Sequence, residues 1–216
     1  MLSNNFYFAA KFFRLVIPGL MVANSFIFLS CENKQDEKQD PAFSVYDTLR
    51  INDDVKKMFG KNFKAVLHGN FDEDSLQEVA VGIELTENNN WGIKFILLEA
   101  TDNRLIKKFE TELLDGSFNE SVVSKLRISS YNYDFVYYNS QDYFWGSGGG
   151  EVFSYIIDFN SNSTYYAHLF SEMHRQVELF LSKNITVPEI KDYFISTFRK
   201  DYPEFRLSSQ DVSLDY

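Results

Sequence analysis

The chain has 216 residues, of which 44% are hydrophobic and 17% aromatic, so it can build a core and is not disordered throughout. Four prolines and ten glycines exclude a collagen-like or proline-rich architecture, and a single cysteine excludes a disulfide framework or a multi-cysteine zinc site. The net charge of −10 argues against nucleic acid as a partner.

Residues 1–30 have the pattern of a secretory signal peptide. Lys11 and Arg14 are their only charged residues, and an uncharged apolar run follows from Leu15 to Leu29. This run is shorter than the roughly 20 apolar residues that a helix needs to span a bilayer. A basic start, a short apolar run and a small residue at its end are typical of an export signal. We therefore predict that residues 1–30 are a signal peptide that is removed from the mature chain.

The apolar run ends in Phe28, Leu29, Ser30 and Cys31. This sequence resembles the lipobox of bacterial lipoproteins, in which apolar residues and a small residue precede a cysteine. The resemblance implies cleavage before Cys31 and a diacylglycerol on its sulfur. It also implies a lipid-anchored protein of the bacterial cell envelope, at the outer membrane or exposed on the cell surface. Two acyl chains anchor a protein stably, whereas one chain is marginal. The alternative is an ordinary buried cysteine at the end of a hydrophobic helix.

Residues 31–42 are predicted to be a disordered tether between the lipid and the folded domain, because they are almost entirely polar and charged. The acidic segment Lys34–Glu37 resembles the sorting tracts that some Gram-negative bacteria use to send lipoproteins to the cell surface. The alternative is a linker that is merely soluble. Removal of residues 1–30 takes two of the 21 basic residues and none of the 31 acidic ones, which leaves a net charge of −12.

Residues 43–206 are predicted to form one α+β domain. A short helix is expected over residues 51–60, with Asp53 or Asp54 as its cap and Gly60 at its end. Apolar runs with alternating side chains then predict strands, which short turns should pair in antiparallel fashion. These strands are expected over residues 63–68, 78–85, 92–99, 105–113, 125–129, 133–139, 152–159 and 164–170. Residues 175–182 fit either a further strand or a helix.

A second helix is predicted near the C-terminus. Residues 186–189 read Thr-Val-Pro-Glu, which fits a capping box with proline in the first turn. Ile190, Phe194 and Phe198 then recur every four residues, so one face of the helix should pack on a core. Residues 207–216 are expected to be a frayed tail. The predicted fold is a twisted, mainly antiparallel β-sheet with a short N-terminal helix and a packed C-terminal helix.

The loop over residues 69–82 carries the clearest candidate for binding chemistry. Oxygen-bearing side chains recur at every second position, which is how a tight loop can surround a hard cation such as calcium. The stretch resembles the calcium loop of FG-GAP/VCBS repeats, in which an aspartate-rich turn joins two strands. The resemblance implies four side-chain ligands and one carbonyl ligand, namely Asn70, Asp72, Asp74 and Glu78, with Leu76 supplying the carbonyl. The alternative is a solvated acidic hairpin turn.

A second candidate is the glycine-rich segment that follows Tyr143, Phe144 and Trp145. It lacks the endings of phosphate-binding and dinucleotide-binding loops. These three aromatic residues could therefore contact a protein or carbohydrate ligand, or they could form a buried cluster. None of the three histidines is spaced as in a helical zinc motif, so we expect them to serve in packing.

Three functions agree with these patterns. The leading hypothesis is a non-enzymatic envelope lipoprotein that binds a ligand or partner through its loops, because no recognisable set of catalytic residues is present. The second is a hydrolase that acts on envelope or extracellular polymers through unidentified acids. The third is an immunity or inhibitor protein whose acidic surface faces a basic toxin. A pocket holding two acids of raised pKa would favour the hydrolase, and a flat acidic face would favour the inhibitor.

Overall fold

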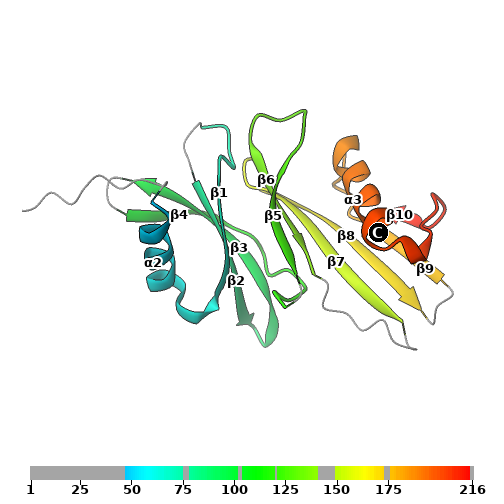
Figure 1. Ribbon diagram of the computed structural model, residues 1–216, viewed down its shortest axis with the longest axis horizontal. Coiled ribbons are helices and arrows are strands. Elements are labelled where there is room, and N and C mark those ends of the chain that lie inside the picture. The colour runs from blue at the N-terminus through cyan, green and yellow to red at the C-terminus, as the bar shows by residue number, and fades with distance from the viewer. Residues whose placement is uncertain are drawn as a thin grey trace, which may run out of the picture. The chain divides into compact units, whose positions relative to one another are not determined.

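The computed structural model describes residues 47–74, 78–101, 104–119, 121–140, 149–172 and 176–214, and they form an α+β fold of two β-sheets with helices (Figure 1). These residues all belong to the unit Ala42–Tyr216. The predicted signal peptide, the tether with Cys31, and the candidate residues Leu76, Tyr143, Phe144 and Trp145 lie outside the described residues. None of the described helices is long and apolar enough to cross a membrane.

Helix α2 (Thr48–Phe59) begins earlier than the sequence pattern predicts, because Asp47 caps it. The Asp47 carboxylate accepts a hydrogen bond from the backbone N–H of Arg50 at 3.2 Å, which satisfies one of the free donors of the first turn. The predicted caps, Asp53 and Asp54, are therefore wrong, since both lie inside the helix.

Gly60 ends α2 as predicted. Its φ of 62° lies in the left-handed region, which glycine adopts without steric cost. A 3-10 turn, η1 (Gly60–Asn62), then leads into the first strand. Ile51 and Val55, four residues apart on α2, are fully buried and pack against the first sheet.

The first sheet is a four-stranded antiparallel meander in the order β1-β2-β3-β4. Its strands are β1 (Phe63–Gly69), β2 (Glu78–Glu87), β3 (Asn90–Thr101) and β4 (Arg104–Glu110). Asn88 and Asn89 both have positive φ, which gives the tight turn that the sequence predicts between β2 and β3. Alternate residues of β2 and β3 face α2 on one side and the second sheet on the other.

The second sheet has six strands in the order β10-β9-β8-β7-β6-β5. All neighbours are antiparallel except β10, which lies parallel to β9. Its strands are β5 (Val122–Arg127), β6 (Asp134–Asn139), β7 (Gly150–Asp158), β8 (Ser163–Glu172), β9 (Gln176–Leu181) and β10 (Val212–Leu214). The ambiguous segment 175–182 is thus a strand from Gln176.

Helix α3 (Pro188–Asp201) packs on one face of the second sheet through Ile190, Phe194 and Phe198, as the four-residue repeat predicts. The predicted capping box is wrong, because the helix starts after Val187 and no side chain caps it. Pro188 in the first turn lacks an N–H, so it leaves one donor fewer to satisfy. A 3-10 turn, η2 (Pro203–Phe205), follows the helix.

The residues expected to be a frayed tail are ordered as far as Leu214. Leu207 is 6% exposed within the core under α3, and its carbonyl accepts a hydrogen bond from the Arg199 side chain at 3.1 Å. Val212–Leu214 then completes the sheet beside β9. A three-residue strand has too short a pattern to be found in sequence.

The fold class is α+β with mainly antiparallel strands, as predicted, but the strands divide into two sheets instead of one. A core of interlocking aromatic and aliphatic side chains joins the two sheets, with Phe95 and Leu97 of β3 packed against Val136 and Tyr138 of β6. The second sheet therefore has the first sheet on one face and α3 on the other (Figure 1).

Candidate functional site

The loop between β1 and β2 brings together three of the predicted calcium ligands. Carboxylate oxygens of Asp72, Asp74 and Glu78 all lie within 4.8 Å of one another. Asn70, a fourth predicted ligand, has its backbone tied to Asp134, which donates an N–H to the Asn70 carbonyl at 2.6 Å. The Asp72 carboxylate also accepts the backbone N–H of Asp74 at 2.9 Å, which fixes the turn.

A lysine from a distant strand supplies the positive charge at the centre of these acids. The Lys108 ammonium lies 2.7 Å from Asp72, 3.0 Å from Asp74 and 3.3 Å from Glu78. A fourth carboxylate, that of Glu99, lies at 3.5 Å. We call Lys108 and these four acids the Lys108 cluster. Its ammonium occupies the position among the carboxylates that a bound cation would take.

A bulge in β4 accounts for the position of Lys108. Leu97 pairs with Phe109 but Leu98 pairs with Lys107, so Lys108 is an extra residue without a partner on β3. Such a bulge bends the strand and redirects a side chain. Lys108 can then reach across the sheet edge to the loop.

The sheet register explains why a cation is needed here. Glu78 and Glu99 are directly opposite each other on β2 and β3, and like charges in that position repel. The side chain of Glu78 is also fully buried, and one of its oxygens accepts the backbone N–H of Phe71 at 2.9 Å. Lys108 forms an ion pair with each of the four acids of the cluster, so its ammonium offsets this repulsion.

The electrostatics of the cluster separate the pKa values of its two innermost acids. Burial raises the pKa of Glu78 to about 7, and the neighbouring Asp72 carboxylate adds to this rise against the Phe71 hydrogen bond. Burial would also raise the pKa of Asp72, but its hydrogen bonds to Lys108 and Asp74 outweigh burial and lower it. Burial lowers the pKa of Lys108, and the carboxylates more than reverse this, so Lys108 stays charged.

The chemistry available to the cluster is therefore limited. Divergent carboxyl pKa values can mark an acid–base pair in an enzyme. Here, however, Glu78 is fully buried and the Lys108 ammonium lies between the acids, so a substrate would have to displace Lys108 to reach them. The arrangement holds the β1–β2 loop against β4.

A separate cleft of about 620 Å³ lies where the end of β4 meets the β7–β8 hairpin, and sequence reasoning missed it. Its volume is in the range of small-molecule sites in proteins. The walls combine aromatic rings with hydroxyl, amide and carboxylate groups, and the main lining residues are Phe109, Glu110, Glu112, Tyr155, Thr164 and Tyr166.

The walls of the cleft are held by specific contacts. On one side, Thr111 accepts the backbone N–H of Phe95 at 3.1 Å, and Leu114 exchanges backbone hydrogen bonds with Ile93. On the other side, the hydroxyl of Tyr155 accepts the backbone N–H of Asp115 at 3.1 Å. The segment that follows β4, residues 111–114, is therefore held against the first sheet, and Asp115 is held against the second.

Aromatic side chains continue from the cleft along the same face of the second sheet. Tyr155 and Tyr166 are cross-strand partners, and the next pair along β7 and β8 is Phe153 and His168, whose rings stack at 4.3 Å. The His168 ring also contacts the Glu151 carboxylate at 2.8 Å. The packing role predicted for the histidines holds for His168. Together these residues extend the aromatic lining beyond the cleft.

A partial signal for the cleft was present in the sequence. Tyr155 and Tyr166 lie in predicted strands, at positions whose side chains project from a sheet face. These tyrosines meet residues 109–114 only because of the way the two sheets pack, and the alternating pattern does not specify that packing. No protein-family model, curated protein or solved structure matches the chain, so the function is inferred from this geometry.

Proposed function

We propose that this chain is a lipid-anchored lipoprotein of the bacterial cell envelope, and that its two-sheet domain binds a ligand without catalysing a reaction. The anchoring part rests on the lipobox-like sequence at Phe28–Cys31. The binding part rests on one observation, the cleft of about 620 Å³ lined by aromatic and polar side chains. An anchor and a cleft together are the features expected of a protein that holds a ligand at the cell envelope.

The chemistry of the cleft favours a carbohydrate as the ligand. Tyr155 and Tyr166 offer aromatic rings to the apolar face of a sugar. Thr164 and Asn162 offer hydroxyl and amide groups, and Glu112 offers a carboxylate, to the sugar hydroxyls. A few polar groups among apolar walls are the usual composition of a specific small-molecule site.

The hydrolase remains an alternative function, and the contacts of the acids argue against it. The acids with clearly divergent pKa values, Asp72 and Glu78, are held by Lys108 within the Lys108 cluster. In the cleft, Glu110 forms an ion pair with Lys107 at 3.0 Å. Turnover of a bound glycan, abolished by Glu112→Gln, would support the hydrolase. Capture of a basic protein in place of a glycan would support the immunity or inhibitor alternative.

The lipid anchor is tested by acyl labelling in cells. Cys31→Ala should abolish labelling and release the chain from the membrane fraction, because the thiol that carries the lipid is absent. Ser30→Ala is the matched control, since it keeps a small residue before the cysteine and should be labelled as the native chain is. Equal labelling of the Cys31→Ala variant would refute the lipoprotein proposal.

The cleft is tested by glycan binding to the mature chain. Tyr166→Ala should weaken binding by at least about tenfold, as expected for loss of an aromatic anchor in a binding site. Tyr131→Ala is the control, because Tyr131 is likewise half-buried but packs with the core under α3. If both variants bind equally well, the cleft is not the site.

Calcium binding by the β1–β2 loop stays a prediction. Three of the expected ligands converge, and Lys108 already neutralises part of their charge. Calcium would have to compete with the ammonium, so we expect the Lys108→Met variant to bind calcium more tightly than the native chain. Calorimetric titration of both proteins measures this difference. Equal heats, or no heat from the variant at millimolar calcium, would retire the calcium hypothesis.

A further inference from the structure

An exposed tryptophan, two lysines and a glutamate line a hollow at the end of α2. The hollow has a volume of about 350 Å³ and lies between η1 and the β2–β3 hairpin. Its lining includes Lys61, Lys64 and Trp91, and the Trp91 side chain is 51% exposed. Exposed tryptophans are uncommon on soluble surfaces, because the indole ring is large and mostly apolar.

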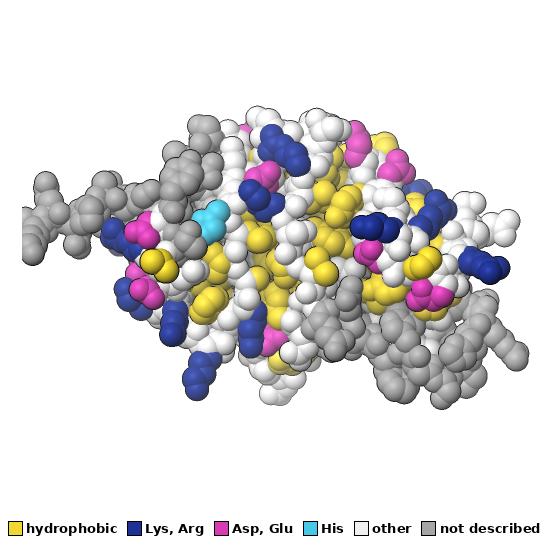
Figure 2. All heavy atoms as spheres, viewed as in Figure 1, with side chains coloured by type: hydrophobic (Ala, Val, Ile, Leu, Met, Phe, Trp, Pro, Cys, Tyr) yellow, Lys and Arg dark blue, Asp and Glu magenta, His cyan; other side chains and the backbone are white. Residues whose placement is uncertain are grey.

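The surrounding segment is basic in a chain that is strongly acidic. Residues 56–64 contain four lysines and no acidic residue, whereas the whole chain has a net charge of −10. Figure 2 shows lysines and arginines over the part of the surface formed by α2 and the segment after it, with acidic side chains among them. We call Lys61, Lys64 and Trp91, which line the hollow together, the Trp91 surface.

The ion pairs leave part of this positive charge uncompensated. Lys64 lies 3.4 Å from Glu84, whose other oxygen accepts the backbone N–H of Phe118. Lys57 pairs with Asp54 at 2.8 Å. Lys61, in contrast, has no ion pair within the part of the chain that the structure describes. An anion that enters the hollow would thus meet a free ammonium beside an indole ring.

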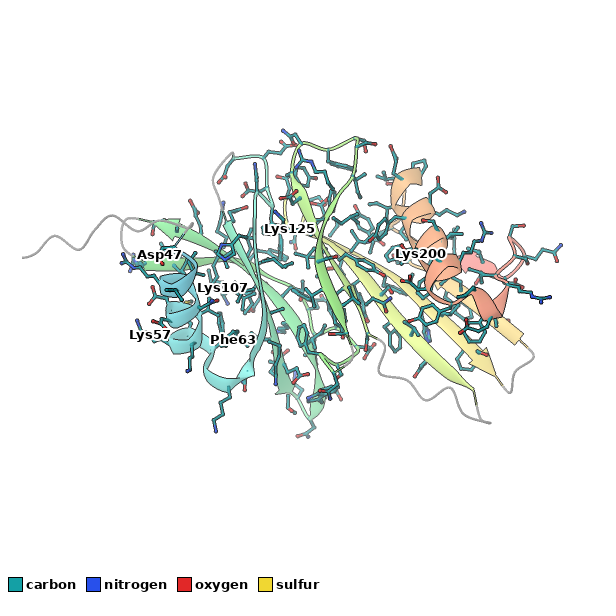
Figure 3. All side chains as sticks on the ribbon, viewed as in Figure 1. Asp47, Lys57, Phe63, Lys107, Lys125 and Lys200 are labelled. Carbon is teal, nitrogen blue, oxygen red and sulfur yellow. The ribbon has the colours of Figure 1, made fainter. Side chains whose placement is uncertain are left out.

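The connection to the anchor allows this surface to reach a membrane. Figure 3 shows Lys57 in the last turn of α2 and Phe63 at the start of β1, at the same end of the helix, with Asp47 at the other end. The 16 residues from Glu32 to Asp47 can extend to roughly 55 Å, whereas a helix the length of α2 is about 18 Å long. The tether is therefore long enough for either end of α2 to touch the bilayer.

We propose that the Trp91 surface docks on the anionic phosphate headgroups of the bilayer to which the chain is anchored. Tryptophan prefers the membrane interface, where its ring meets the acyl boundary and its N–H meets the headgroups. Lysines near an anionic bilayer are attracted to lipid phosphates. The inference rests on the proposed lipid anchor, which brings this surface to the membrane, and it fixes which side of the domain faces the lipid.

Two tryptophans make the surface directly observable. Trp91 and Trp145 are the only tryptophans of the chain, so Trp145→Phe leaves Trp91 as the sole indole reporter. The lipidated full chain is reconstituted into phosphatidylglycerol vesicles whose acyl chains carry bromine, which quenches nearby indoles. We expect Trp91 to lose most of its emission and its spectrum to shift to the blue. The reciprocal variant, Trp91→Phe, should lack this component.

The lysines are tested in the mature chain, from residue 31 onward, with Cys31→Ala, so that any binding to vesicles occurs without the lipid. Replacing Lys61 and Lys64 by glutamine should weaken binding to phosphatidylglycerol vesicles by about 30-fold, since each basic residue near an anionic surface contributes roughly fivefold. The matched control replaces Lys125 and Lys200, which Figure 3 labels on β5 and α3. Like the test variant, this control removes one lysine that forms an ion pair, Lys125 with Asp134, and one exposed lysine, Lys200, that has no ion pair in the described residues. The control should bind the vesicles as tightly as the Cys31→Ala chain does.

The outcomes separate this inference from the proposed function. An acylated chain whose Trp91 keeps its emission in brominated vesicles overturns the docking surface and leaves the lipid anchor intact. Equal binding of the two lysine variants also overturns it. Conversely, a chain that is never acylated in cells refutes the anchor. Lysine-dependent binding of the Cys31→Ala chain to anionic vesicles, with none to phosphatidylcholine, would support the docking surface even then.

Discussion

Replacing Lys108 by methionine tests whether one ammonium group holds the β1–β2 loop in place. Methionine replaces the apolar stem of the side chain, one atom shorter, and removes its charge. Lys108 is 29% exposed, and its four carboxylate partners range from fully buried Glu78 to Asp74, which is 37% exposed. The variant therefore leaves several acids close together, at least one of them buried, with no cation between them.

The magnitude follows from the burial of the cluster. Removing one partner of a fully buried ion pair costs about 3–5 kcal/mol, because the other charge is left uncompensated. Exposed pairs contribute only about 0–1 kcal/mol. Because the Lys108 cluster is partly exposed and Glu78 can take up a proton, we expect Lys108→Met to lower the free energy of unfolding by about 2–4 kcal/mol. For a domain of this size, that lowers the melting temperature by roughly 6–12 °C.

The neighbouring lysine provides the control. Lys107 lies in the same strand and pairs with Glu110 at 3.0 Å, but both side chains are about half exposed, at 51% and 42%. Lys107→Met should therefore cost less than about 1 kcal/mol. Both variants are compared by urea unfolding followed by circular dichroism at neutral pH. The deficit of Lys108→Met should shrink in acid, where the carboxylates become protonated. If the two variants are equally stable at neutral pH, the structural role of Lys108 is refuted.

Three further predictions concern single buried groups. Burial raises the pKa of Glu78 from 4.5 to about 7. The stabilisation by the protonated side chain is therefore complete below pH 4.5 and is lost as the pH rises through 7. This loss should lower the free energy of unfolding by up to about 3 kcal/mol. Glu78→Gln should lose that dependence, so it should gain stability relative to the native chain between pH 5 and pH 8 in urea unfolding; parallel pH profiles would contradict this. Gly82→Ala should destabilise by about 1–3 kcal/mol in thermal melts, because a Cβ there would lie 2.6 Å from the ring of Phe118; an unchanged melting temperature would show that the ring moves freely. Tyr138→Phe should lower the free energy of unfolding by about 1–2 kcal/mol, because the buried carbonyl of Ser117 would lose its 2.6 Å hydrogen bond. A loss below roughly 0.5 kcal/mol, the lower limit for such a bond, would indicate that another donor replaces it.

Local patterns predicted the parts of the fold that depend on neighbours in sequence. The repeat of Ile190, Phe194 and Phe198 predicted the buried face of α3, and the short gap between the strands predicted over 78–85 and 92–99 predicted a turn, which the structure places at Asn88 and Asn89. Helix starts were less predictable, because several acids near α2 could each cap it. Asp47 was the one placed to bond the first-turn N–H groups, and this depends on where the chain enters the helix.

Features that depend on distant contacts could not be predicted from local patterns. Strands of both sheets alternate in the same way, so the pattern does not say that β4 ends one sheet and β5 begins another. Asp72, Asp74 and Glu78 were predicted as a converging set, and they do converge. Their cation was missed, because Lys108 lies 30 or more residues away and reaches them only through a bulge that no spacing rule indicates.

The parallel pairing of β10 with β9 bears on how the protein should be handled. A strand with open backbone groups invites other chains to add to it, and natural proteins usually protect such edges. Val212–Leu214 covers one side of β9, and Leu207 anchors the approach to it. Shortening the chain before Leu207, or fusing a bulky reporter directly after Tyr216, would risk uncovering that strand and promoting self-association. Purification labels are better placed elsewhere.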